Sequence, residues 1–222
     1  MAGLVGPAGA AIISVDNVDV VITEAAGLDL SPGPSIKSSS FRAYNERQAV
    51  DIAADTLLVD YVVGQNLSVG PAAVPGIETS DGGIFLPEGR YDSHIIIFNP
   101  GTGSPVSGPA TFTLSGRIVG IVVSNNTVGN GTRLLDASDD VLGNAIAYTG
   151  VPISRRLELS DTFTLLGNRQ IRLNDDFAVG GQFTDEIRII TRTVVPVPPT
   201  LALMLGALGG AALLARRRRA AT

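Results

Sequence analysis

The sequence predicts an all-β fold, an antiparallel β-sandwich of jelly-roll type followed by a single C-terminal transmembrane helix. Many short runs are rich in β-branched and aromatic residues, and clusters of Gly, Pro, Asn and Asp separate them, which is the pattern of a sandwich. Near the end of the chain, residues 201–215 form an uncharged run of Leu, Ala, Gly and one Met, and this run predicts the helix.

Nine runs have the composition of strands. In chain order they are residues 18–23, 56–63, 94–98, 110–114, 118–123, 156–159, 162–165, 170–173 and 186–191. Within one of them Leu157 and Leu159 alternate with Glu158, as in a strand with one buried face. Turn-forming residues at 31–34, 80–83, 99–103, 129–131 and 180–181 separate the runs. Residues 139–147 suggest one or two helical turns, and residues 69–83 suggest a long loop or a weak edge strand.

The chain divides into three predicted parts. Residues 1–13 are apolar with small residues at their end, so we predict the remnant of a secretory signal peptide with a cleavage site at Ala8-x-Ala10. The alternative is a buried first strand. Because no Lys or Arg precedes Lys37, we expect upstream residues to complete the signal. Residues 14–194 are then the exported sandwich domain, and residues 195–222 are a C-terminal sorting signal.

The composition of the chain excludes several kinds of site and disfavours one class of partner. The chain has no cysteine, which excludes a disulfide scaffold, thiol catalysis and thiolate metal sites. The formal charge of the chain is −5; its tail holds four arginines and no acid, so residues 1–199 carry −9. An acidic outer domain disfavours nucleic acid as a partner.

The tail has the physical properties of a short membrane segment. A helix over residues 201–215 would be about 22 Å long, against a hydrocarbon core of about 30 Å, so we expect local thinning of the bilayer rather than tilt. Arg216, Arg217, Arg218 and Arg219 follow directly and mark the cytoplasmic end, which places the preceding domain outside. Residues 193–200 form a semi-rigid Pro-rich spacer before it.

These tail residues resemble the PEP-CTERM class of bacterial sorting signals, in its Val-Pro-Leu-Pro-Ala variant. The resemblance rests on Val195, Pro196 and Pro198, the apolar run and the arginine cluster. Val197 stands where that variant has Leu, and Pro199 and Thr200 stand where it has Ala, so the subtype of processing enzyme stays open. The resemblance implies recognition by an exosortase, an integral-membrane transpeptidase. It also implies a stay in the inner membrane before release to the cell surface, in a bacterium that makes exopolysaccharide.

The single histidine of the chain, His94, follows Asp92 and Ser93 at the entry of an apolar strand. Neighbouring strand residues point to opposite faces, so Asp92 and His94 should share a face while Ser93 points away. A catalytic triad needs the three groups to converge, so we assign no catalytic residue. We expect a structural histidine. The alternative is a histidine paired with a carboxylate that binds a metal or a ligand.

An ion site is predicted at Asp136, Ser138 and Asp140, whose oxygens alternate like those of a calcium loop. The match to an EF-hand ends there, because Gly and Glu are missing at its sixth and twelfth positions. The alternative is that Asp136 or Ser138 caps a helical turn that begins near Asp139. Calcium is thus the one candidate cofactor, and residues 174–176 form a second, weaker acidic turn.

A second resemblance covers the outer domain. Residues 89–94, 98–100 and 135–139 resemble motifs of uncharacterised exported PEP-CTERM proteins, which implies a fixed turn or ion-stabilised loop rather than a reaction. The six glutamates show no spacing that pairs two of them, and without tryptophan a sugar-stacking platform is thin. Our first hypothesis is therefore a non-enzymatic surface or matrix protein, structural or adhesive in the envelope or biofilm. The alternatives are a calcium- or glycan-binding module and a polymer hydrolase.

Overall fold

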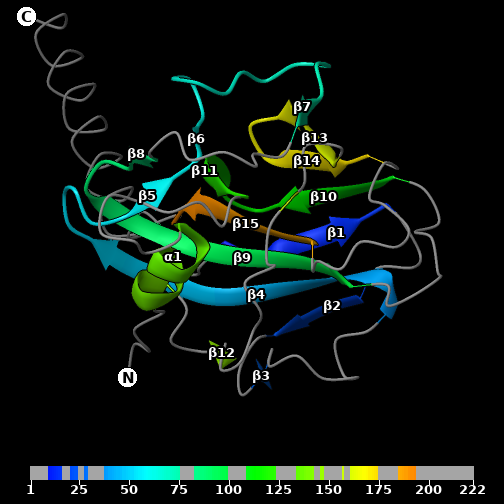
Figure 1. Ribbon diagram of the computed structural model, residues 1–222, viewed down its shortest axis with the longest axis horizontal. Helices are drawn as coiled ribbons and strands as arrows, with labels where there is room; N and C mark the ends of the chain where they lie inside the picture. The colour runs from blue at the N-terminus through cyan, green and yellow to red at the C-terminus, as the bar shows by residue number, and fades with distance from the viewer. Residues whose placement is uncertain are drawn as a thin grey trace, which may run out of the picture. The chain divides into compact units, whose positions relative to one another are not determined.

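Two β-sheets packed face to face make up most of the computed structural model (Figure 1). The structure describes residues 10–16, 21–24, 28–29, 38–75, 83–99, 109–123, 134–142, 146–147, 157, 161–174 and 185–193. All of these belong to the unit Gly9–Thr193. The predicted sorting motif at residues 195–199, the apolar run 201–215 and the arginine cluster 216–219 lie outside the described residues. Within the described ranges, no helix has the length and apolar content to cross a membrane.

The smaller sheet has five strands, all paired antiparallel. In spatial order they are β1 (Ile12–Val15), β10 (Ala110–Leu114), β14 (Gln170–Leu173), β13 (Thr162–Gly167) and β7 (Val74–Pro75).

The larger sheet has six strands, and the only parallel pair in it is β2 with β4, at one edge. In spatial order they are β2 (Val21–Glu24), β4 (Ser38–Ile52), β9 (Gly89–Asn99), β15 (Asp185–Arg192), β11 (Arg117–Val122) and β6 (Tyr61–Val62). Two short pairs complete the strands: β5 (Leu58–Val59) with β8 (Ile84–Phe85), and β3 (Leu28–Asp29) with β12 (Ile146–Ala147). The predicted packing of antiparallel sheets as a sandwich is confirmed.

The core between the two sheets follows from the two-residue period of the strands. Residues of β10 alternate between buried and half-buried, and its Phe112 is fully buried. Phe112 meets Phe41 of the larger sheet edge to face, with ring centroids 6.2 Å apart, and Phe98 lies 5.2 Å from Phe41. Burial of aromatic and branched side chains from both inner faces thus holds the sandwich together.

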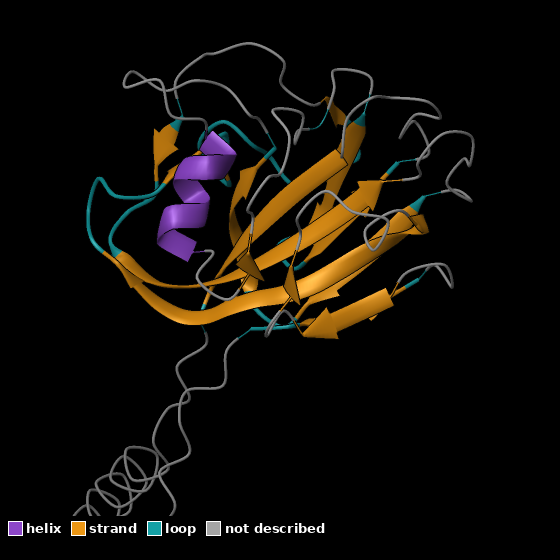
Figure 2. Ribbon diagram, turned by 60° about the horizontal axis from the view of Figure 1, so that its bottom comes forward, coloured by secondary structure: helices purple, strands orange, loops and turns teal. Residues whose placement is uncertain are grey.

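The outer face of the larger sheet is covered as well. A helix, α1 (Leu134–Leu142), lies across this face (Figure 2) and contacts β4 and β5. Leu134, Leu135 and Leu142 recur at helical spacing and are buried in a second core with Tyr91 and Ile190. The central strands of the larger sheet are therefore buried on both sides.

Several predicted elements need correction against the described structure. The helix occupies Leu134–Leu142 instead of residues 139–147, because its apolar stripe begins at Leu134. The longest strand, β4, was missing from the prediction because its sequence is polar. The predicted strands at 110–114 and 170–173 are confirmed at both ends.

Ala10 and Ala11 precede β1, and Ile12 is its first residue; all three pack into the sandwich. Three successive backbone amides donate to side chains: Ala10 N to Asp92 Oδ2 at 2.8 Å, Ala11 N to Ser115 Oγ at 2.8 Å and Ile12 N to Asn45 Oδ1 at 2.8 Å. Ala10 is 1% exposed and lies directly over Gly116, where an added Cβ would come within 2.5 Å of the Ala10 Cβ. Ala10 and Ile12 are therefore buried where the chain enters β1, while the predicted signal-peptide residues 1–9 lie outside the described residues.

This close approach yields a stability prediction. Gly116→Ala should lower the free energy of unfolding by about 1 to 3 kcal/mol, because the new methyl overpacks against Ala10 and the Arg192 carbonyl. Ala10→Gly in the same chain should restore part of the loss. Gly167→Ala is the matched control, since nothing lies within 4 Å of its added Cβ. Guanidinium unfolding of the wild type and the three variants measures this, and equal effects of Gly116→Ala and Gly167→Ala would contradict the packing.

Candidate functional site

Two polar clusters occupy opposite faces of the larger sheet, and they contain four of the residues that the sequence singles out: Asp92, Ser93, His94 and Ser138. Asp92 and His94 face the smaller sheet, where Asp92 binds Ala10 directly and His94 is linked to Ile12 through Asn45. Ser93 faces α1, where it joins Glu46 and Arg188. The prediction that Asp92 and His94 share one face while Ser93 points away is confirmed.

His94 is fully buried and bonded at both ring nitrogens. Its Nδ1 lies 3.0 Å from Asn45 Oδ1, and its Nε2 lies 3.1 Å from Thr191 Oγ1. The same Asn45 oxygen accepts the backbone N–H of Ile12, so this atom is an acceptor and the facing Nδ1 must donate. Nε2 then accepts from the Thr191 hydroxyl. The network therefore fixes one neutral tautomer of the ring.

Burial also sets the charge of His94. Desolvation of the ring lowers its pKa from the usual 6.5 to about 3, because no water solvates the imidazolium form. A neutral, fully bonded ring in the core cross-links β4, β9 and β15 through Asn45 and Thr191. This is the geometry of a structural histidine.

Asp92 bonds to the backbone instead of to His94. Its Oδ1 accepts from Ala49 N at 2.6 Å and its Oδ2 accepts from Ala10 N, and within the described residues no hydrogen bond joins it to the imidazole. Ala49 lies at a bulge of β4 with φ of 58°, a conformation unusual for alanine. Arg90 Nε donates to the Ala49 carbonyl at 3.1 Å. Asp92 and Arg90 thus hold this bulge through the N–H and the C=O of one residue, Ala49.

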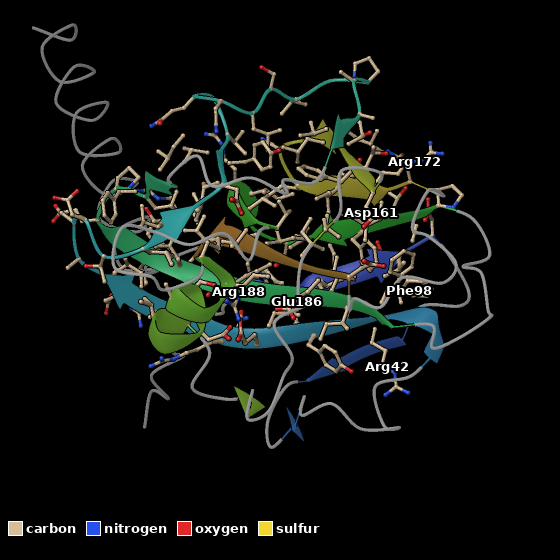
Figure 3. The ribbon with its side chains drawn as sticks, viewed as in Figure 1. Arg42, Phe98, Asp161, Arg172, Glu186 and Arg188 are labelled. Carbon is tan, nitrogen blue, oxygen red and sulfur yellow. The ribbon has the colours of Figure 1, made fainter. Side chains whose placement is uncertain are left out.

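The second cluster is centred on Arg188, which is 0% exposed and lies beside α1 (Figure 3). Its Nε and Nη2 donate to the two carboxylate oxygens of Glu46 at 3.1 and 3.0 Å, a bidentate ion pair. Nη2 also donates to Asp139 Oδ1 at 2.6 Å. Nη1 donates to the Leu135 carbonyl at 3.2 Å and to Ser138 Oγ. All five N–H bonds of the guanidinium are therefore used.

Glu46 also accepts a hydrogen bond from a third strand, β9. The Ser93 hydroxyl donates to Glu46 Oε2 at 2.5 Å. The cluster consequently ties β4, β9 and β15 to α1 in a space where the side chains of both Glu46 and Arg188 are 0% exposed. Among the described residues it is a closed network, and its chemistry is that of a structural clamp.

Ser138, one of the three predicted calcium ligands, belongs to this clamp. It is 1% exposed, donates to the Leu135 carbonyl at 2.7 Å and accepts from Arg188. On a helix, positions 136 and 140 lie about 40° apart and position 138 lies about 200° from position 136, so the backbone does not gather the three on one side. The side chains of Asp136 and Asp140 lie outside the described residues. Calcium binding by these two carboxylates stays a prediction, and the described residues contain no cluster of three or more His, Asp or Glu able to hold a metal.

Sequence reasoning did not find Glu46 or Arg188. Glu46 lies in a polar stretch with no strand pattern, and Arg188 lies between Ile187 and Ile189 in a run whose alternation predicts one exposed face. The sequence holds one signal: Ile189 and Ile190 are adjacent, which puts an apolar residue on each face of the strand, and an arginine in a strand buried on both faces requires a partner.

No protein-family model, no curated protein and no solved structure matches this chain.

The neutral state of His94 predicts a pH dependence of stability. Above pH 6.5 the ring is neutral in both the folded and unfolded states. Between pH 6.5 and about 3 only the unfolded chain binds a proton, so the free energy of unfolding falls as the pH falls. From pH 7.5 to 4.5 the loss from this group should be roughly 2 to 3 kcal/mol.

The control for this prediction is His94→Asn, which removes the only imidazole of the chain. Carboxylates titrate alike in both proteins, so subtracting one unfolding free energy from the other at each pH isolates His94. The wild-type protein should lose more stability on acidification than the variant. Parallel curves would show that the ring is not buried in its neutral form.

The Arg188 clamp predicts that the stability of the fold depends strongly on both Arg188 and Glu46. Arg188→Met should lower the free energy of unfolding by about 3 to 5 kcal/mol, since Glu46 is left charged and buried. Adding Glu46→Gln should recover part of that loss. Asp51→Asn is the control, because the Arg90–Asp51 pair is 3.8 Å long and its side chains are 40% and 83% exposed. Urea unfolding should show a loss below about 1 kcal/mol there, and an equally small loss for Arg188→Met would rule out the clamp.

Proposed function

We propose that this chain is an exported, non-enzymatic protein of the bacterial cell surface or extracellular matrix, structural or adhesive in the envelope or biofilm. The observation that carries the proposal is the order of the C-terminal sequence: a Pro-rich spacer, the apolar run 201–215, and then Arg216 to Arg219. In this proposal a jelly-roll sandwich precedes one transmembrane helix. The domain is held outside the inner membrane until an exosortase-type transpeptidase acts near residues 195–199.

The described structure supports a binding or structural role for the sandwich. The side chains that could serve as acid, base or nucleophile are buried and form hydrogen bonds that join strands. They are Asp92, Ser93, His94 and Glu46. A sandwich stabilised by its own core and ionic clamp, without any cysteine, is also suited to a location where thiols would oxidise.

Mass spectrometry of the processed protein tests the sorting route. The chain would be expressed behind a secretory leader in one bacterial strain with an exosortase and in a matched strain lacking it. We expect the mature C-terminus to lie upstream of residue 201 in the first strain and to include Arg219 in the second. Pro196→Ala with Pro198→Ala should reduce processing. A mature protein that retains Arg219 in both strains would overturn the proposal.

A further inference from the structure

A surface groove of about 260 Å³ lies at the junction of β6, β11 and β15 with the residues that lead into β9. These three strands are neighbours at one side of the larger sheet (Figure 1). The floor is apolar: Val62, Leu86 and Tyr91 are buried in it, and Val63, Pro87 and Val119 present exposed or half-buried apolar surface beside them. Gln65, Arg117 and Arg192 are exposed at the rim. We call this site the Arg117–Arg192 groove.

Two arginines lie side by side at the rim of the groove, on neighbouring strands. Arg117 of β11 is the direct antiparallel partner of Arg192 of β15, so their side chains leave the sheet on the same face. Within the described part of the chain neither forms an ion pair. Like charges directly opposite on neighbouring strands destabilise a sheet, and a bound anion would relieve this repulsion. This local excess of positive charge contrasts with the net −9 of residues 1–199.

The floor of the groove holds one arginine in place. The Tyr91 hydroxyl donates to the Pro87 carbonyl at 2.6 Å, and its ring is 1% exposed, which fixes the ring. The Arg192 guanidinium lies 5.8 Å from the centroid of this ring, within the range of a cation–π contact. Arg192 is thereby positioned at the groove with its N–H donors still available for an anion.

We propose that the Arg117–Arg192 groove binds a carboxylate carried on a compact ring with an apolar face, that is, a uronic acid unit. A planar carboxylate matches the fork of a guanidinium, and two such forks face one space. The C–H face of a sugar ring can cover the apolar floor, and the Gln65 amide can bond a ring hydroxyl. The volume of the groove suits one sugar ring and not an extended chain within it.

The same unit could arrive as a free sugar acid or as one residue of an acidic polysaccharide. The groove is on the surface, so both forms can reach it. This inference gives the glycan-binding hypothesis a definite site. It goes beyond the sorting proposal and does not depend on it, because binding can be measured whether or not the tail is processed.

The test is isothermal titration of the full chain, purified in neutral detergent, with glucuronate, a galacturonate trimer, glucose and inorganic phosphate. Both uronates should bind, glucose should not, and phosphate should bind more weakly than the uronates because it has no ring to cover the floor. Arg117→Gln and Arg192→Gln should each weaken uronate binding about tenfold or more. Stronger binding of the trimer identifies a polymer as the ligand, and equal binding identifies the free acid.

The matched control is the double variant Arg169→Gln with Arg172→Gln, compared with Arg117→Gln with Arg192→Gln. Both doubles remove two exposed positive charges, and the control charges lie at the β13–β14 turn and on β14 of the other sheet. The control should bind uronate like the wild type, and thermal unfolding should show that both doubles are folded. The proposal is overturned if the uronates do not bind, if phosphate binds as well as they do, or if both doubles lose binding equally.

Discussion

The bidentate pair between Arg188 and Glu46 is the interaction on which the arrangement of the larger sheet and its helix depends. One guanidinium joins β4 and β15 through Glu46 and reaches α1 through the Leu135 carbonyl, Ser138 and Asp139. A buried ion pair contributes little net stability compared with a well-packed apolar pair, but any arrangement that separates its members leaves a charge unpaired in the core. The pair therefore acts through specificity: it permits one position of the helix on the sheet and penalises displacement along it.

The need for such a clamp follows from burial on both faces of the larger sheet. Its inner face packs on the smaller sheet and its outer face packs on α1, so β9 and β15 are buried on both faces over residues 91–98 and 185–191. Each polar side chain on these strands then requires a partner inside the protein. His94 is paired with Asn45 and Thr191, Asp92 with two backbone amides, and Ser93 with Glu46. The Asp-Ser-His sequence thus serves two separate networks on opposite faces.

The sequence predicted the sandwich because its apolar alternation is local, and β10 and β14 were located to the residue by that signal. It missed β4, whose Asn45, Glu46 and Arg47 read as a polar segment. Asn45 and Glu46 can be buried in a strand because distant partners bind them: His94 binds Asn45, and Ser93 and Arg188 bind Glu46. Local patterns cannot report such contacts, since Glu46 and Arg188 are 142 positions apart. The segments 89–94 and 135–139, which stood out as motifs, meet at this clamp through Ser93, Ser138 and Asp139.

The polar side chains in the core are bonded to one another, so a ligand would bind at the surface. The negative charge of the domain affects which ligands can approach that surface. Residues 1–199 carry −9, so an acidic polymer is repelled at long range. At physiological ionic strength this repulsion is screened beyond about 8 Å, whereas the Arg117–Arg192 groove acts at contact distance. One sugar unit in a shallow groove gains little free energy against the cost of immobilising it. A repeating polymer changes that balance, because many copies of the domain displayed on one surface can engage successive units of one chain. An adhesive role therefore requires only weak binding at each groove, and weak individual contacts allow such a surface to rearrange without losing the polymer.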